Sequence, residues 1–220
     1  MFDQNKTSPV FVDIGNTAIK ARYQGNTANY SQEELLKIDF AVVANVRTNR
    51  FVTPEHWCEV GVVDCFAGFE TCYDRVSDLG VDRWLAMLAI APRLQQGECC
   101  ILVDAGTAIK IEVFTRDKQL GGFILPGIQL AQDALFTKAD RLNQASFDGT
   151  MALGQNTLTT IGRAMPAAVL ALIEKLVSQY NPALLALTGG NADVFVPHLP
   201  SAQTYDNLVL DGLELWWAKQ

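Results

Sequence analysis

Short apolar runs alternate along the chain with stretches whose apolar residues recur at the spacing of an amphipathic helix. The runs predict strands at residues 9–14, 18–23, 40–46, 60–66, 99–104, 109–114, 119–125 and 184–187. The amphipathic stretches predict helices at residues 32–37, after Pro54, and at 81–96, 128–137, 157–179 and 208–219, with a kink or a break at Pro166. Strand hairpins followed by helix and strand alternation occur twice, which indicates an α/β protein with mixed sheets covered by helices.

One segment of this pattern occurs twice. Residues 12–20 read VDIGNTAIK and residues 103–110 read VDAGTAIK, and the second copy lacks a counterpart of Asn16. Each copy ends one apolar run and precedes another, which predicts a strand, a glycine turn and a returning strand. Because residues 96–98 (QGE) are the first clear break between the copies, we expect two lobes, residues 1–97 and residues 98–220.

The first copy has the chemistry of a phosphate site. Gly15 lets the backbone approach a phosphate, and Asn16 and Thr17 add N–H and side-chain donors. Asp13 can reach Mg²⁺, most readily through water because magnesium keeps several waters, and Lys20 can direct its ammonium group at a phosphoryl group. One copy alone is also compatible with an ordinary β-hairpin. The second copy in the same context favours two jaws around one polyphosphate.

In the second copy, Asp104 and Thr107 would form the opposing jaw, where Thr107 offers its hydroxyl and its N–H to a phosphate. Residues 188–192 (TGGNA) follow a predicted strand. Their paired glycines allow a flat ligand such as a nucleobase to lie against the backbone, or form no more than the turn that begins a helix. The sequence contains neither the P-loop pattern nor the dinucleotide fingerprint, so any nucleotide site uses another scaffold.

A different cluster lies at residues 79–84 (LGVDRW), where a helix is predicted to begin. Asp82 would act as a general base for a substrate hydroxyl, and Arg83 would bind an anionic group. Tyr73 would border the same pocket. The alternative is a helix cap followed by a surface arginine, because Asp is favoured at helix N-termini.

Composition narrows the choice of partners. The chain has 220 residues, of which 49% are apolar, and a formal net charge of −7 without a Lys/Arg block, which disfavours nucleic-acid and anionic-membrane binding. No stretch reaches the roughly 20 apolar residues of a membrane span, and residues 1–9 lack a signal-peptide pattern, so we expect a cytoplasmic protein. The five cysteines form no Cys-x-x-Cys pair, which predicts reduced, mostly buried thiols and no zinc site.

Taken in order, these motifs resemble the type III pantothenate kinase family, which belongs to the superfamily of acetate kinase, sugar kinases, Hsp70 and actin. The matching segments are residues 13–20, Tyr73 with 80–84, 104–107, Gly121-Gly122 with Pro126-Gly127, 155–157 and 188–190. The resemblance implies two similar lobes of actin-like, ribonuclease H-like fold, with an ATP cleft between the lobes. It also implies a homodimer.

The activity that the resemblance implies is ATP-dependent phosphorylation of pantothenate to 4'-phosphopantothenate, the first step of coenzyme A biosynthesis. The implied ATP contacts are Asp13, Ile14, Gly15, Asn16, Thr17, Ala18, Ile19, Lys20 and Thr107. The implied pantothenate contacts are Tyr73, Gly80, Val81, Asp82, Arg83 and Thr157, with Asp82 as the catalytic proton acceptor. Besides Mg²⁺ near Asp13, a monovalent cation, K⁺ or NH₄⁺, would bind Asp104.

Two other functions stay open from the sequence. One is a noncatalytic accessory factor for transcription within the same family. The retained Asp13, Asp82, Asp104 and Thr107 argue against a dead enzyme, and the acidic composition argues against direct DNA contact. The other is a sugar or acetate-type kinase of the same superfamily, which would share the ATP residues and differ in the acceptor pocket around Asp82 and Arg83.

Overall fold

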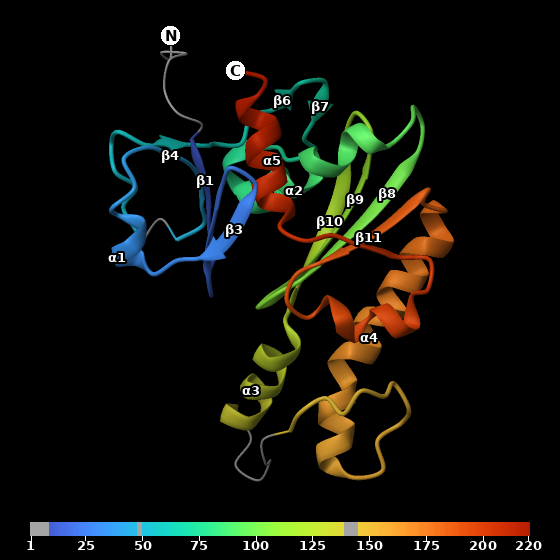
Figure 1. The fold of residues 1–220 in the computed structure, drawn as a ribbon. Coiled ribbons are helices and arrows are strands. Elements are labelled where there is room, and N and C mark those ends of the chain that lie inside the picture. The colour runs from blue at the N-terminus through green and yellow to red at the C-terminus, as the bar shows by residue number, and fades with distance from the viewer. Residues whose placement is uncertain (1–8, 48–49, 139–144) are drawn as a thin grey trace. The chain divides into compact units, whose positions relative to one another are not determined.

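A computed structural model describes residues 9–47, 50–138 and 145–220 of the chain (Figure 1). The chain packs into two compact units, residues 1–93 with 207–220 and residues 94–206. The predicted boundary after residue 97 lies a few residues beyond residue 93, where the first unit passes into the second. The predicted second lobe also included the C-terminal helix, and the structure corrects this, because that helix packs in the first unit.

The first unit contains a five-stranded sheet of order β3-β2-β1-β4-β5. Its strands are β1 (Val10–Ile14), β2 (Ile19–Tyr23), β3 (Asn26–Asn29), β4 (Ala41–Asn45) and β5 (Cys58–Glu59). β1 pairs antiparallel with β2 and parallel with β4, so the sheet is mixed as predicted. Every residue of β4 is buried, which fits a central strand covered on both faces.

Helices of the first unit are α1 (Gln32–Leu35), α2 (Val81–Ile90) and α5 (Leu208–Trp217). α2 and α5 pack closely against each other, and α5 also contacts β1 and β4. Gly212 makes this approach possible, because a Cβ there would collide with the carbonyl oxygen of Leu85. A short hairpin, β6 (Cys65–Phe66) with β7 (Phe69–Glu70), stacks Phe66 on Trp216 at a centroid distance of 6.3 Å.

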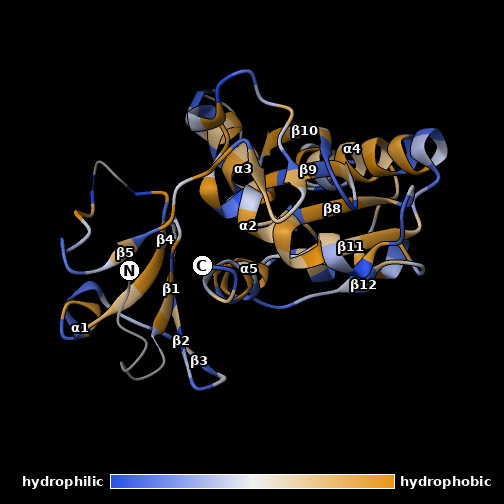
Figure 2. Cartoon of the chain, turned by 90° about the horizontal axis from the view of Figure 1, so that it is seen from above, coloured by the Kyte–Doolittle hydropathy of each residue, from blue (hydrophilic) through white to orange (hydrophobic). Residues whose placement is uncertain are grey.

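The second unit repeats the arrangement of the first, with strand order β10-β9-β8-β11-β12. Its strands are β8 (Cys99–Ala105), β9 (Ala108–Thr115), β10 (Gln119–Pro126), β11 (Leu184–Thr188) and β12 (Gln203–Thr204). The central strand β8 again pairs antiparallel with its hairpin partner β9 and parallel with β11. The strands β8 and β11 are hydrophobic along most of their length (Figure 2). The prediction of two similar α/β lobes is therefore confirmed.

Two helices complete the second unit, α3 (Ile128–Lys138) and α4 (Thr157–Tyr180). α4 continues through Pro166, where a break or kink was predicted. A proline removes the N–H that would bind the carbonyl four residues earlier, here that of Gly162. The buried side chain of Gln132 donates to this carbonyl oxygen at 3.2 Å and so satisfies it from α3. The helix is therefore continuous, and a neighbouring helix supplies the donor that Pro166 lacks.

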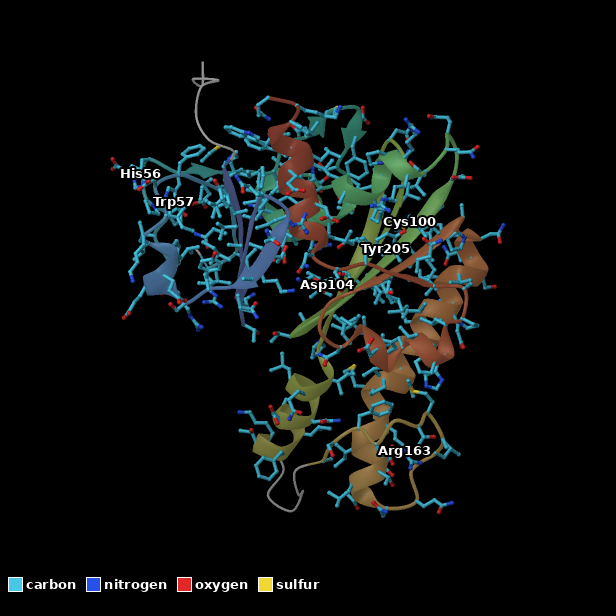
Figure 3. All side chains as sticks on the ribbon, viewed as in Figure 1. His56, Trp57, Cys100, Asp104, Arg163 and Tyr205 are labelled. Atoms are coloured by element: carbon cyan, nitrogen blue, oxygen red, sulfur yellow. The ribbon has the colours of Figure 1, made fainter. Side chains whose placement is uncertain are left out.

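Other predicted elements differ from the structure. The helix predicted after Pro54 is a turn, which places Trp57 in the core with its indole N–H donating to the Ile38 carbonyl at 3.2 Å (labelled in Figure 3). The strand predicted at residues 60–66 does not form, since most of these residues are exposed and only β6 appears at its end. The helix predicted at 81–96 ends at Ile90, and a 3₁₀ turn, Ala91–Arg93, follows around Pro92.

The five thiols are free, as predicted, but they are not mostly buried, as was also predicted. Cys100 is buried, Cys58 and Cys99 are half-buried, and Cys65 and Cys72 are exposed. Burial raises the pKa of the Cys58, Cys99 and Cys100 thiols, which keeps these three protonated and weakly reactive. Within the described residues, no helix combines the length and the apolar character needed to cross a membrane.

Candidate active site

The first repeated segment forms a hairpin between β1 and β2. Asp13 and Ile14 end β1, and Lys20 lies opposite Asp13 in the antiparallel register. Between the strands, Asn16, Thr17 and Ala18 are exposed, whereas Asp13 is half-buried. A half-buried carboxylate beside an exposed turn suits a metal-bound phosphate, because the turn can offer backbone N–H groups without rearrangement.

The next feature was not visible in the sequence: α5 bonds to the hairpin. Lys20 Nζ donates to Asn207 Oδ1 at 2.9 Å, and Arg22 Nη1 donates to Asp211 Oδ1 at 2.7 Å and Glu214 Oε2 at 3.0 Å. Lys20 and Arg22 lie on one face of β2, two residues apart, and their partners lie along one face of α5. The start of α5 thus positions the ammonium group of Lys20, which the sequence predicts to bind phosphate.

The second repeated segment forms the equivalent hairpin between β8 and β9. Asp104 lies opposite Lys110 in the register, as Asp13 lies opposite Lys20. Here the two side chains bond to each other, with Lys110 Nζ 3.0 Å from Asp104 Oδ2 (Asp104 is labelled in Figure 3). The ion pair is partly shielded, because the side chains of Asp104 and Lys110 are 28% and 22% exposed. The sequence analysis gave Lys110 no role.

Glycine-containing turns surround the second hairpin. Gly127 donates its N–H to the Thr107 carbonyl at 2.9 Å, and the N–H of Asn191 donates to the Ala105 carbonyl at 2.8 Å. Gly189 has φ +92°, and a Cβ there would lie 2.6 Å from Asp104 Oδ1. The turn after β11 is therefore part of the Asp104 site. A nucleobase contact at residues 188–192 stays a prediction.

The predicted acceptor cluster is assembled at the start of α2. Arg83 is buried, its Nη1 donates to the Tyr73 hydroxyl at 2.8 Å, and its guanidinium carbon lies 5.4 Å from the centroid of the Tyr73 ring. Asp82 Oδ1 accepts the N–H of Arg83 at 2.9 Å. The N-cap of α2 is Gly80, so Asp82 is a first-turn residue and not the cap, and the buried Arg83 is not the surface residue that the alternative interpretation requires. A buried guanidinium held by a tyrosine is typical of an anion-binding site.

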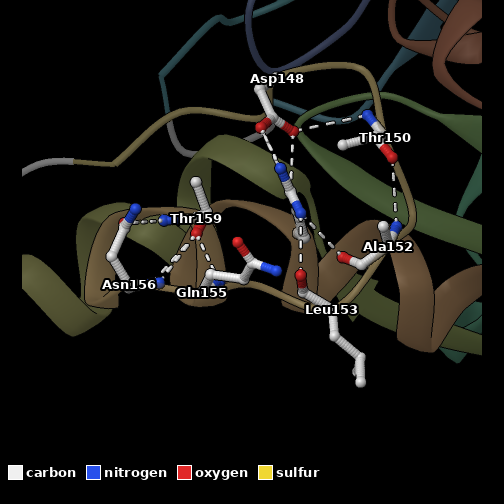
Figure 4. A network of polar contacts seen from close by, with 8 residues as sticks. Asp148, Thr150, Ala152, Leu153, Gln155, Asn156 and Thr159 are labelled. Atoms are coloured by element: carbon white, nitrogen blue, oxygen red, sulfur yellow. Dashed lines mark hydrogen bonds and ion pairs between the residues drawn. The ribbon is translucent and has the colours of Figure 1, made fainter.

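Thr157, the last predicted pantothenate contact, is the exposed first residue of α4 in the second unit. The chain before it is held tightly to the helix (Figure 4). Asn156 and Thr159 form a capping box, and Arg163 binds Asp148 at 2.7 Å and the carbonyl of Leu153 at 3.0 Å. The Arg163 guanidinium holds the pKa of Asp148 below its usual range. These contacts fix where α4 begins.

Magnesium suits the oxygen donors of the first hairpin. No group of three or more His, Cys, Asp or Glu side chains that would enclose a metal occurs in the part of the chain described. Mg²⁺ in ATP sites is usually held by one or two carboxylates, waters and the phosphates themselves, so a single carboxylate such as Asp13 fits this chemistry.

Two units with the same strand arrangement, each carrying one of the repeated hairpins on its central strand, define a two-lobed α/β fold that solved structures share. A structure from Sinorhizobium meliloti assigned as a 2-dehydro-3-deoxygalactonokinase matches with a TM-score of 0.56 at 10% identity, covering 96% of both chains. A structure from Campylobacter jejuni, assigned to the Baf family of transcriptional activators, matches with a TM-score of 0.64 at 22% identity, covering 95% of this chain and 97% of that one. At these identities both show the fold alone.

Sequence comparison gives the family. The family model described as type III pantothenate kinase matches residues 41–179. A type III pantothenate kinase from Acinetobacter baumannii is 31% identical over 206 residues, covering 88% of this chain and 82% of that protein. One from Pseudoalteromonas translucida is 27% identical over 225 residues, covering 94% and 95%. The chain belongs to the type III pantothenate kinase family.

Proposed function

We propose that this protein transfers the γ-phosphoryl group of ATP to pantothenate, giving 4'-phosphopantothenate for coenzyme A biosynthesis. Family membership supports the reaction. The observation that carries the acceptor assignment is the buried Arg83 held by Tyr73 beside Asp82, because pantothenate is a carboxylate with a primary hydroxyl. Since the reaction consumes ATP, we place it in the cytoplasm.

For ATP, we propose that residues 13–20 bind the phosphates, with Asp13 contacting Mg²⁺ through water and Lys20 directing its ammonium group at them. The exposed turn and the half-buried carboxylate support these roles. Thr107, in the equivalent turn of the second unit, is proposed as a further phosphate contact. Magnesium supplies charge neutralisation of the transferring phosphoryl group, which such reactions need more than covalent chemistry.

For pantothenate, we propose that Arg83 and Tyr73 bind the carboxylate and that Gly80, Val81 and Asp82 line the hydroxyl end. Thr157 is proposed as a further contact on the strength of the resemblance. Asp82 would accept the proton of the primary hydroxyl as its oxygen attacks the γ-phosphorus. Asp82 Oδ1 accepts the Arg83 N–H, which helps to orient the carboxylate for this role.

The accessory-factor and sugar-kinase functions make different predictions from pantothenate phosphorylation. We expect purified protein with Mg²⁺ to form ADP from ATP when pantothenate is present, measured by coupled ADP detection and by mass spectrometry of the product. Glycerol and hexoses should give no ADP above the rate without acceptor. Equal turnover on a hexose would favour a sugar kinase, and no ADP with any acceptor would favour the noncatalytic factor.

We further infer that the protein is a homodimer. β10 is at the edge of its sheet, and six large apolar side chains on β10 and α3 are exposed, which suits a surface that a second copy covers. This apolar patch consists of Leu120, Phe123, Ile124, Leu130, Leu135 and Phe136. Ile124 is the most exposed of the six, at 61%.

A charge in the apolar patch should separate the copies. We expect wild-type protein to elute at twice the chain mass in size-exclusion chromatography with light scattering. Phe136→Glu should raise the dimer dissociation constant at least about 30-fold, since an unpaired buried charge costs about 2–5 kcal/mol. Val52→Glu is the matched control, because Val52 is 86% exposed and lies outside the patch. A monomeric wild type, or equal effects of the two substitutions, would contradict the inference.

A further inference from the structure

Asp104, the carboxylate predicted to bind a monovalent cation, already forms an ion pair with the ammonium group of Lys110. Lys110 Nζ lies 3.0 Å from Asp104 Oδ2, in a pair whose side chains are less than one-third exposed. We propose that the Lys110 ammonium group is a built-in monovalent cation of this active site, so that the enzyme works without added K⁺ or NH₄⁺. The proposal rests on the proposed kinase function and replaces the free ion expected from the resemblance.

The chemistry of the ammonium group fits this role. A lysine ammonium carries the same single charge as K⁺ and N–H donors of the same kind as NH₄⁺. A free cation at Asp104 Oδ2 would have to share that oxygen with Lys110 or displace it, and two like charges around one carboxylate repel each other. The opposite oxygen, Oδ1, is packed against the backbone at Gly189, where an added Cβ would lie 2.6 Å away.

The first hairpin shows that this ion pair is not forced by the register. Asp13 faces Lys20 as Asp104 faces Lys110, yet Lys20 Nζ donates to Asn207 on α5. In the second hairpin the equivalent lysine turns to its cross-strand carboxylate instead. The same residue pair thus has two arrangements in one chain. In the first arrangement Lys20 donates to Asn207 at the start of α5, and in the second Lys110 pairs with the aspartate across the hairpin.

Partial burial makes the pair persistent enough to replace an ion. An exposed Lys–Asp pair is screened by water and contributes little, whereas the Asp104–Lys110 pair sits between the turn after β11 and the β8–β9 hairpin. A covalently attached cation also acts at high effective concentration and needs no ion from solution. We therefore expect the occupancy of this site to be independent of salt composition.

The first test compares salts on the wild-type protein. ADP formation with ATP, Mg²⁺ and pantothenate is measured in tetramethylammonium, sodium, potassium and ammonium chlorides at equal ionic strength. The four rates should agree within about twofold, because screening depends on ionic strength and is the same in all four salts. A rise of about tenfold or more specific to K⁺ and NH₄⁺, as for a free ion that stabilises transition-state charge, would overturn the proposal.

The second test removes the ammonium group. Lys110→Met should lose about tenfold or more in kcat in tetramethylammonium chloride and regain activity with K⁺ or NH₄⁺, since these can then bind Asp104. Lys110→Arg should stay independent of these ions. Lys175→Met is the control, because it removes an equally charged, exposed side chain from α4. A Lys110→Met variant that neither loses activity nor responds to K⁺ would contradict the proposal.

Thermal unfolding separates this proposal from the proposed function. The melting temperature of the wild type should be the same in K⁺ and tetramethylammonium salts, and K⁺ should stabilise only Lys110→Met, because a ligand that binds the folded state raises its stability. This readout needs no turnover, so a wild type without kinase activity would refute the function and still leave the cation site measurable. Specific stabilisation of the wild type by K⁺ would refute the built-in cation. Should Lys110→Met not fold, the wild-type comparisons in both assays decide.

Discussion

Asp82→Asn is expected to lower kcat for pantothenate phosphorylation about 10²- to 10⁴-fold, the usual range for losing a positioned general base. The substitution separates the two functions of Asp82. An asparagine side-chain oxygen can still accept the N–H of Arg83, so this first-turn hydrogen bond of α2 is kept. The negative charge and the ability to take a proton are lost. Steady-state kinetics with pantothenate as the varied substrate give the result directly.

The stability of this variant separates a catalytic role of Asp82 from a structural one. Its melting temperature should stay within a few degrees of the wild type, because Asn can keep the hydrogen bond to the Arg83 N–H. Asp78→Asn provides a matched control four residues earlier, where the carboxylate forms an exposed ion pair with Arg75 at 2.8 Å. That substitution should change kcat little. If Asp82→Asn keeps near-normal kcat, Asp82 serves only the first turn of α2 and the base must be sought elsewhere.

The repeated hairpins are the part of the fold that the sequence predicts best. A strand, a turn and a returning strand are local, so the register that sets Asp13 opposite Lys20 follows from the pattern of a few neighbouring residues. The hydrogen-bond partner of each lysine cannot be predicted from this local pattern. Lys20 reaches Asn207, 187 positions away, and no local pattern of either segment indicates that contact. The two similar motifs therefore behave differently, and for Lys20 the reason lies in a distant segment of the chain.

Non-local packing also explains the errors. The C-terminal helix was assigned to the second lobe because of its place in the chain, yet Gly212 lets it pack against α2 in the first unit. Pro166 predicted a kink or a break in this region, and the structure has one continuous helix in which Gln132 of another helix supplies the missing donor. Arg83 looked equally suited to the surface, and its burial depends on Tyr73, ten residues earlier. Each outcome was decided by a partner that periodicity cannot identify.

Gly189→Ala is expected to destabilise the protein by about 2–6 kcal/mol, the sum of backbone strain for a side chain at a left-handed φ and of overpacking. Gly189 has φ +92°, and its Cβ would lie 2.6 Å from Asp104 Oδ1 and 2.7 Å from the carbonyl oxygen of Ala105. The clash falls on the central strand and on the carboxylate that pairs with Lys110. The melting temperature and kcat should therefore fall together.

Gly190→Ala is the control that makes this prediction specific to geometry. The neighbouring glycine has no atom within 4 Å of an added Cβ, and its φ is not in the left-handed region, so its stability should change by less than about 0.5 kcal/mol. The KM of Gly190→Ala for ATP also tests the predicted nucleobase contact, because a methyl group on that surface would displace a base lying against it. Equal stability of Gly189→Ala and Gly190→Ala would mean that the turn after β11 does not press on Asp104. The Asp104–Lys110 pair would then owe its position to the β8–β9 hairpin alone.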